Sequence, residues 1–298
     1  MSPAAALLAL LSVLGSGDAF GEHWYDGQAE LSGYRWRGTR YGEPRTGEAV
    51  AIFVTEPFSA AQHVKVDRPA EHTGEVVTVL KLNLVRDFQT GIYDYDTMSS
   101  CFVDVERFGA LKLSFSSSEW CGNVYEELDV RADGLALSVH SYFQGESVTK
   151  TLPARADALL GDQLFVWLRG LRALPLAAGE TRTFPYLPDA FERRLRHREA
   201  GWTELEVARV AEPVALVLPA GSFSAIEYRL TSGDGRTGRV EVDQAYPHRL
   251  LAWRWARGEE LLDAGELTGS KRLKYWELQR QGQEALRAEL GLSVPAAR

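Results

Sequence analysis

The sequence has 298 residues, a formal net charge of −8 at neutral pH and 45% hydrophobic residues. This length can bury the core of one large β domain or of two smaller ones. The acidic balance and the lack of a long Lys/Arg run argue against a nucleic-acid-binding protein, because phosphate contacts need a basic surface. The densest basic stretch, residues 192–199, is interrupted by acids and is typical of a solvated helix or loop.

The first residues have the layout of a cleavable secretory signal. An apolar run from Ala4 to Leu14 is followed by small residues that end at Ala19. The segment before the run has no Lys or Arg, so a buried N-terminal helix is the alternative. The run is too short to span a bilayer, and no later stretch approaches twenty apolar residues. We therefore expect export to the periplasm or the medium, with no transmembrane segment in the mature chain.

Period-two patterns predict strands through the first half of the chain. Residues 48–55 and 75–83 are apolar, β-branched runs that are typical of strands covered on both faces. Apolar and polar residues alternate over 110–117 and 134–143. Turn signals such as ADG at 132–134 separate these runs, so the spacing indicates an antiparallel meander.

Cys101 and Cys121 are the only cysteines. In an oxidising compartment they could form a disulfide. In a simple three-stranded meander between residues 101 and 130 they lie at the same end but two strands apart, roughly twice the 4.8 Å strand spacing. That distance is too long for a disulfide unless the turn at 116–120 folds over the sheet, so both alternatives stay open. Two isolated cysteines without a CxxC or a His pair predict no metal site.

Residues 157–171 change to a helical period, with Asp157 as N-cap. They predict one internal helix. The Pro- and Gly-containing stretch that follows marks a seam near 172–190. Strands are expected again within 202–218, 222–231, 237–243 and 248–256, and residues 275–291 predict a terminal helix whose inner side is Leu278, Ala285 and Leu286.

The glycine-rich stretch SGDG, residues 232–235, falls between two of these strands. Glycines that supply positive φ and an Asp that tolerates it are what a tight hairpin needs. A phosphate loop would need a following helix and a Lys before Ser or Thr, and a calcium loop would need oxygen ligands at alternate positions. Neither pattern follows, so we interpret the stretch as a hairpin turn.

The second half of the chain resembles a known family. DALLGDQLFVWLRGLRALPLAAGE, VALVLPAGSFSAIEYRL, GRVEVDQAYPHRLLAWRW and GELTG occur in this order. Together, over roughly 155–270, they resemble a family of exported bacterial proteins that is classified as a domain of unknown function. Some similar proteins carry the label septum formation inhibitor Maf. Maf proteins are cytoplasmic nucleotide pyrophosphatases with an α/β fold and a Ser- and Arg-rich N-terminal loop, and no comparable segment stands here.

Catalytic patterns are weak. Asp87, Asp94 and Asp96 form the densest acidic group, which could share a proton or bind a cation, or be a solvated turn. A glycosidase needs two carboxylates across an aromatic cleft, and Glu119 beside Trp120 or Glu126 beside Glu127 could contribute. The chain has no G-x-S-x-G elbow, no H-E-x-x-H pair, and no dinucleotide or P-loop fingerprint.

Aromatic residues give the best sequence case for binding. Trp253 and Trp255 share one face of a predicted strand, where they could line a ligand groove or belong to the core, while Arg249 and Arg254 point elsewhere and could meet anionic head groups. His23 lies beside Trp24 and Asp26, just after the expected cleavage site. As a lone histidine it could equally be structural.

Together these patterns predict a mainly β protein. We expect an antiparallel curved sheet, half-barrel or sandwich with one internal helix and one C-terminal helix. The expected organisation is a signal peptide over 1–19, a single β domain over 20–290 and a disordered tail over 291–298.

The expected function is that of a non-catalytic envelope protein that binds an apolar or amphiphilic ligand, or a protein partner, on its concave face. It would need no cofactor. The alternatives are a glycan-acting hydrolase with paired carboxylates and a purely structural envelope protein. The candidate ligand-binding residues are Trp253, Trp255, His23, Asp94, Asp96 and Trp120.

Overall fold

The alternating runs of the sequence fold into long strands that share one sheet. The structure, a computed structural model, describes residues 18–295; most of the expected signal segment 1–19 lies outside the described residues. The strands are β1 (Ala29–Arg40), β2 (Glu43–Ser59), β3 (Val64–Lys65), β4 (Val76–Thr90), β5 (Tyr93–Asp104), β6 (Ala110–Glu119), β7 (Gly122–Arg131), β8 (Gly134–Ser141), β9 (Val148–Leu152), β10 (Leu159–Leu160), β11 (Thr181–Leu187), β12 (Thr203–Arg209), β13 (Val214–Leu218), β14 (Gly221–Ser232), β15 (Thr237–Asp243), β16 (Leu250–Arg257) and β17 (Glu260–Leu273).

Helical segments are few and short. They are α1 (Ala19–Trp24), α2 (Leu164–Arg169), α3 (Ala190–Leu195) and the 3₁₀ segments η1 (Pro69–Glu71), η2 (Gly161–Gln163), η3 (Tyr275–Glu277) and η4 (Gln283–Leu290). Among residues 18–295, no helix is both long and apolar enough to cross a bilayer.

Strands that pair in the sheet are mostly close in the sequence, and the main exception is the pairing of the last strand, β17, with the first, β1. From one edge the strands run β10, β11, β12, β14, β15, β16 and β17, and then β1, β2, β4, β5, β6, β7, β8 and β9. β13 continues beside β14, and β3 pairs with the end of β2. Every pair is antiparallel except β10 with β11. The strands before and after the expected seam at 172–190 belong to this one sheet.

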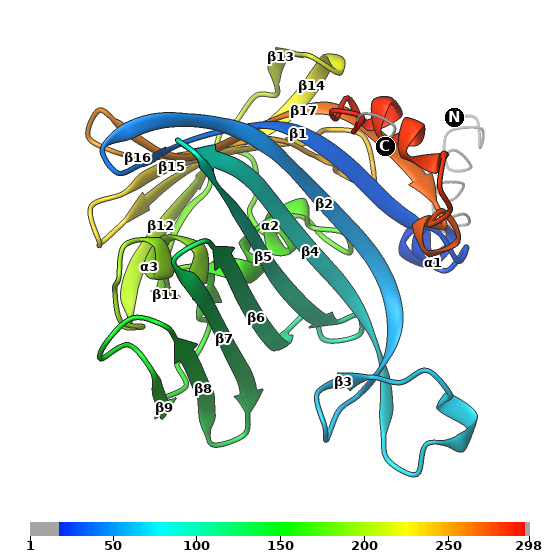
Figure 1. Ribbon diagram of the computed structural model, residues 1–298. Coiled ribbons are helices and arrows are strands. Elements are labelled where there is room, and N and C mark those ends of the chain that lie inside the picture. Colours follow the sequence, from blue (N-terminus) through cyan, green and yellow to red (C-terminus); the bar gives the residue numbers. More distant parts are fainter. Residues whose placement is uncertain (1–17, 296–298) are drawn as a thin grey trace, which may run out of the picture.

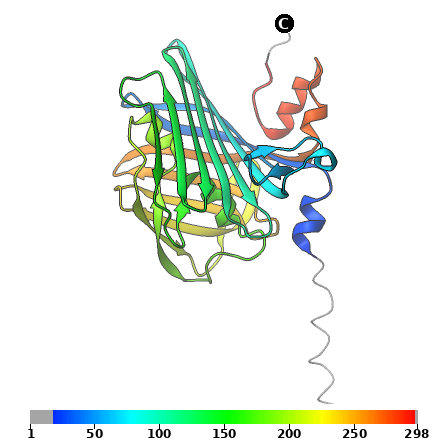
Figure 2. The same cartoon turned by 90° about the horizontal axis from the view of Figure 1, so that it is seen from below.

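The sheet curls without closing. Strands β4–β9 face strands β11–β17, and β1 and β2 connect the two halves (Figure 1; Figure 2). Within the described residues, no pairing joins the edge strands β9 and β10. The predicted mainly β, curved antiparallel sheet or half-barrel is therefore confirmed.

The concave face is filled by the chain itself. Along β4, Leu80, Leu82 and Leu84 point inward and are buried. Three helical segments, η2, α2 and α3, pack between the two halves, and we call them the inner segment. The Phe165 ring of α2 lies 5.3 Å from the Trp253 ring. Two small voids beside the inner segment measure about 10 and 30 Å³, enough for roughly one or two water molecules. Wider openings lie at its edges, one of about 440 Å³ between the end of α3 and strands β8 and β9, and one of about 220 Å³ between α3 and the β1–β2 turn.

Buried ion pairs connect the inner segment and the strands. Arg169 of α2 donates to both carboxylate oxygens of Glu30 at 2.8 and 2.9 Å, and Arg193 of α3 pairs with Glu126 of β7. Asp263 of β17 accepts hydrogen bonds from Arg86 of β4. It also accepts from the indoles of Trp36 at 2.6 Å and Trp253 at 2.9 Å. One carboxylate thus joins strands β1, β4, β16 and β17.

The internal helix is shorter than the sequence period suggests. Leu159 and Leu160 form β10 instead, since they pair with Tyr186 and Leu187 of β11. Only Leu164–Arg169 is α-helical, and Gly170 in the left-handed region ends it. Tertiary pairing therefore overrides the local helical preference at the start of the segment.

The terminal helix is likewise interrupted. Gly282 has φ of 91°, which breaks the run into η3 and η4. Ala285 and Leu286, expected on the inner side, are exposed, and Leu290 is the buried residue of η4. Beyond η4, in the range expected as a tail, Leu292 is buried and the Ser293 amide donates to Glu48.

The SGDG stretch is a hairpin turn, as predicted. It connects β14 to β15, and Gly235 takes positive φ. Asp234 accepts from the amide and the side chain of Arg236. The buried Arg236 guanidinium also donates to Asp189, the N-cap of α3, and so holds the turn against the inner segment.

Candidate functional site

The two candidate tryptophans of β16 lie in the core. Trp253 and Trp255 are 1% and 5% exposed. Each lies across a glycine of a neighbouring strand, Trp253 over Gly265 and Trp255 over Gly238, where an added Cβ would come within 3 Å of the ring. Mid-strand glycines opposite aromatic residues are the sequence signal for this packing. Both indoles fill the interior, which leaves no ligand-sized space beside them.

The acidic candidates lie on the opposite, convex face. Asp94 and Asp96 are exposed on β5, and Asp87 lies beside Asp96 on β4. Partial burial and the neighbouring carboxylates Asp96 and Asp94 raise the pKa of Asp87. Trp120 is in the β6–β7 turn at one end of the sheet and is exposed to solvent.

The carboxylates considered for glycan hydrolysis do not converge. Glu126 points inward and is 2% exposed, bound by Arg193 and Arg194. Asp94 and Asp96 are on the outer face of the sheet, and Glu119 ends β6. The sheet therefore separates Glu126 from the two aspartates.

His23 belongs to α1 and contacts the end of β17. Its Nε2 lies 2.7 Å from the Arg272 guanidinium, and its ring packs edge-on against Trp24. Burial and the Arg272 charge lower the pKa of His23. This contact holds the N-terminal segment against the sheet.

The cysteines are not brought together. Cys101 is buried on β5, Cys121 is exposed in the β6–β7 turn, and both are free thiols. Cys101 is opposite Leu113, whereas the turn begins after the Tyr95–Glu119 pair, six positions further along β5. At about 3.3 Å per residue this places them roughly 20 Å apart, well beyond disulfide reach.

A ligand-sized hollow lies instead on the convex face, beneath the C-terminal segment. We call it the C-terminal groove. Its volume is about 360 Å³, and η4 packs against β1 and β17 beside it. Figure 2 shows the C-terminal segment outside the curled sheet. The groove is lined by Leu31, Leu273, Tyr275, Leu278, Gln279, Arg280, Gln283, Glu284, Leu286, Arg287 and Leu290.

Long-range contacts position this groove. Gly33 and Gly269 are opposite each other on β1 and β17. A Cβ at either would meet backbone atoms of Leu290 within 3 Å, so two glycines allow η4 to approach the sheet. The Thr268 hydroxyl donates to the Leu290 carbonyl oxygen at 2.7 Å. Leu31 and Val54 join Leu290 and Leu292 in a small apolar cluster separate from the interior core.

The groove has an apolar wall and a charged edge. Arg287 donates to Glu48 and to the Ser293 carbonyl oxygen, so its charge is engaged. Arg280 also lines the groove but makes no ion pair with any residue that the structure describes. This arrangement suits a molecule with an apolar chain and an anionic end. The sequence signal was the pair Leu278 and Leu286, which the pattern of residues 275–291 places with Ala285 on the inner side of a predicted terminal helix.

No protein-family model matches the sequence, and a search of the curated proteins finds no match. Two solved structures are similar to the chain. A β-barrel-like protein of the domain of unknown function DUF1849 from Brucella abortus is 11% identical with a TM-score of 0.46, over 83% of this chain and 98% of that chain. A Bacteroides fragilis protein that is inferred to be exported and has a YmcC-like fold is 11% identical with a TM-score of 0.20, over 80% of this chain and 99% of that chain.

Proposed function

We propose that the chain is an exported envelope protein that acts by binding, and that it holds an anionic amphiphile in the C-terminal groove. The observation that carries this proposal is the groove itself, a volume of about 360 Å³ with six apolar side chains on its wall and, at its edge, Arg280, which makes no ion pair within residues 18–295. Small-ligand pockets span roughly 300–1,000 Å³. Most of the concave face, where the sequence suggested a ligand, is filled by η2, α2 and α3, and the opening of about 440 Å³ that remains beside β8 and β9 is lined mainly by polar and charged residues.

An acyl chain is the apolar part that this groove fits. Each methylene group that leaves water contributes about 0.8 kcal/mol, so a medium-length chain gives measurable affinity even after the cost of association. A carboxylate or a phosphodiester end, each with one negative charge, would lie near Arg280 and Arg287. The Glu284 carboxylate on the same edge disfavours an end group with two or more negative charges.

Leu286→Glu tests the apolar wall. Leu286 is partly exposed, so the variant should fold, and a charge there should weaken binding of dodecanoate and of dodecyl maltoside at least tenfold because the chain would meet a carboxylate. Calorimetry below the micelle concentration measures both affinities. The matched control is Val294→Glu, which changes an exposed apolar residue of the same segment outside the groove. Equal affinities for the two variants, or no saturable binding by the wild type, would contradict the proposal.

Arg280→Glu tests the charged edge in the same assay. We expect dodecanoate to bind at least fivefold more weakly and dodecyl maltoside to bind as in the wild type, because only the carboxylate interacts with the guanidinium. The Leu286 and Arg280 variants together separate chain recognition from end-group recognition. If dodecanoate binding is unaffected, the anionic part of the proposal is wrong although the apolar part stands.

A further inference from the structure

Exposed apolar side chains gather at one end of the sheet. Five large apolar residues are more than half exposed on the body of the sheet: Val217 at 80%, Ile92 at 79%, Trp120 at 69%, Tyr142 at 68% and Tyr41 at 55%. Four of them, all except Val217, lie in successive loops at the same rim. We call Tyr41, Ile92, Trp120 and Tyr142 the apolar rim.

The antiparallel order of the sheet places these loops together. Neighbouring strands here are antiparallel, so β1, β4, β6 and β8 run in one direction and β2, β5, β7 and β9 in the other. The loops that connect β1 to β2, β4 to β5, β6 to β7 and β8 to β9 therefore all lie at the same end of the sheet. Adjacent loops of this set are two strands apart, about 10 Å along the sheet. The four side chains thus extend along roughly 30 Å of rim, one for each loop.

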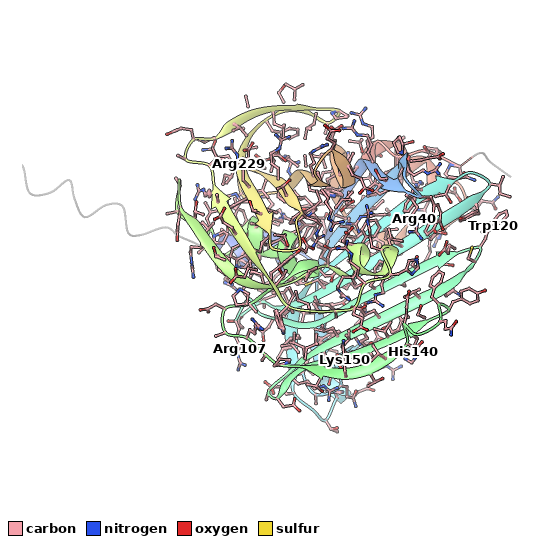
Figure 3. The ribbon with its side chains drawn as sticks, turned by 90° about the vertical axis from the view of Figure 1, so that its left-hand side faces the viewer. Arg40, Arg107, Trp120, His140, Lys150 and Arg229 are labelled. Atoms are coloured by element: carbon pink, nitrogen blue, oxygen red, sulfur yellow. The ribbon has the colours of Figure 1, made fainter. Side chains whose placement is uncertain are left out.

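The opposite rim has different residues. Its β5–β6 loop exposes Glu106 and Arg107, and its β7–β8 turn exposes Asp133. Figure 3 shows Trp120 and Arg107 at opposite ends of the strands. Hairpin turns are usually polar, so a rim whose loops each present a large apolar residue is unusual. On the same rim, the β14–β15 turn is polar, which confines the apolar set to the β1–β9 half.

Three of the four rim side chains contact neighbouring residues of the sheet or its turns. The Trp120 ring lies 6.2 Å from the Tyr93 ring, and Tyr142 covers Gly122, where an added Cβ would meet its ring at 2.4 Å. The Tyr41 hydroxyl is 2.6 Å from that of Tyr95, and the Arg40 guanidinium covers the Tyr41 ring. These contacts hold the three aromatic rings against the sheet, with more than half of each side chain still exposed.

We propose that the apolar rim inserts into the interface of a lipid bilayer. Tryptophan and tyrosine favour this region, where an apolar ring and a polar edge are both satisfied. Four exposed side chains spaced about 10 Å apart along the rim can each enter the head-group region separately. The proposal is independent of the C-terminal groove.

The charges near the apolar rim indicate which kind of membrane surface it would bind. Three charges flank the Tyr41 loop. Arg45 and Glu43 pair with each other, and Arg40 donates to the Leu195 carbonyl oxygen and the Tyr95 hydroxyl. Asp94 adds a negative charge beside the Ile92 loop. The whole chain is acidic, with a net charge of −8. The rim therefore suits a zwitterionic surface, and apolar insertion supplies the attraction.

Vesicle binding tests the proposal. The full chain should sediment with phosphatidylcholine vesicles, and the variant Ile92→Ser/Trp120→Ser should partition at least tenfold more weakly, because both side chains leave the interface. Val217→Ser is the matched control, since Val217 is equally exposed but belongs to β13, outside the rim. It should partition like the wild type. Adding phosphatidylglycerol should not strengthen binding, and brominated lipid should quench Trp120 fluorescence in the wild type.

Several outcomes would overturn the proposal. They are an absence of vesicle binding by the wild type, equal partitioning of the rim variant and the Val217 control, or binding that requires anionic lipid. Dimerisation of the wild type that the rim variant abolishes, without vesicle binding, would assign the rim to contacts between copies. Thermal unfolding of each variant distinguishes misfolding from lost insertion. Leu286→Glu should bind vesicles as the wild type does, because the groove and the rim are separate. The vesicle experiment can therefore be interpreted even if the groove proposal is wrong.

Discussion

Asp263→Ala is expected to lower the free energy of unfolding by about 3–5 kcal/mol, the usual cost of removing one partner of a buried ion pair. The substitution leaves the buried Arg86 guanidinium without its carboxylate. It also leaves the indole N–H groups of Trp36 and Trp253 without their acceptor. Each unsatisfied buried donor adds its own desolvation cost. Urea unfolding of the variant measures the total.

A double-mutant cycle separates the ion pair from the rest. Arg86→Met alone leaves Asp263 with its two indole donors. It should therefore lower the free energy of unfolding by less than Asp263→Ala does. The double variant should lose little more stability than Asp263→Ala alone. In Asp263→Ala the buried Arg86 charge has no partner, whereas in the double variant that charge is absent. Asp133→Ala, at an exposed turn, is the control and should change stability by less than about 0.5 kcal/mol. Additive losses at residues 86 and 263 would show that the pair does not act as a unit.

Asp162→Asn is expected to remove a large part of the pH dependence of stability. Burial in the interior, and secondarily the neighbouring Asp189 carboxylate, raise the pKa of Asp162 from 3.8 to about 7. Between these values the folded state holds a proton that the unfolded state has lost. Stability therefore decreases as pH rises from about 4 to about 7, and deprotonated Asp162 then opposes folding.

The size of this effect follows from the shift. About three pKa units correspond to at most roughly 4 kcal/mol, so we expect the variant to gain about 2–4 kcal/mol relative to the wild type between pH 5 and pH 8. Asparagine keeps an oxygen that can accept the Ala190 amide hydrogen bond, which measures 3.0 Å in the wild type. Urea unfolding at the two pH values provides the comparison. Parallel pH profiles for the two proteins would show that Asp162 is not the responsible group.

The fold could be predicted from sequence because alternation is a local property. The alternating residues 110–117 belong to β6, and the alternation of Leu135, Leu137 and Val139 with polar or small residues marks β8, which ends at Ser141. The two helices were less predictable, since their outcome depends on distant residues. Leu159 and Leu160 have a helical period but pair with β11, and Gly282 divides the terminal run.

The candidate site was harder to predict for the same reason. A mid-strand glycine such as Gly265 signals a large neighbour, but the register between β16 and β17 decides which ring covers it. A strand with two tryptophans is therefore compatible with either a ligand groove or a core. The C-terminal groove requires Leu31 and Leu286 to meet, which are more than two hundred residues apart. The apolar rim depends on strand order, since single exposed residues in separate turns have no shared local pattern.

The pairing of β1 with β17 determines when the fold can be completed. Ala29 is opposite Leu273, so the first strand of the sheet gains its second neighbour only when the last strand is available. Contacts between such distant residues form slowly, because a long loop must close before they contribute. A chain emerging from its N-terminus would therefore stay incompletely folded until its last strand had been made. Such a delay would suit the export that we propose, because an incompletely folded chain can pass through a narrow membrane channel.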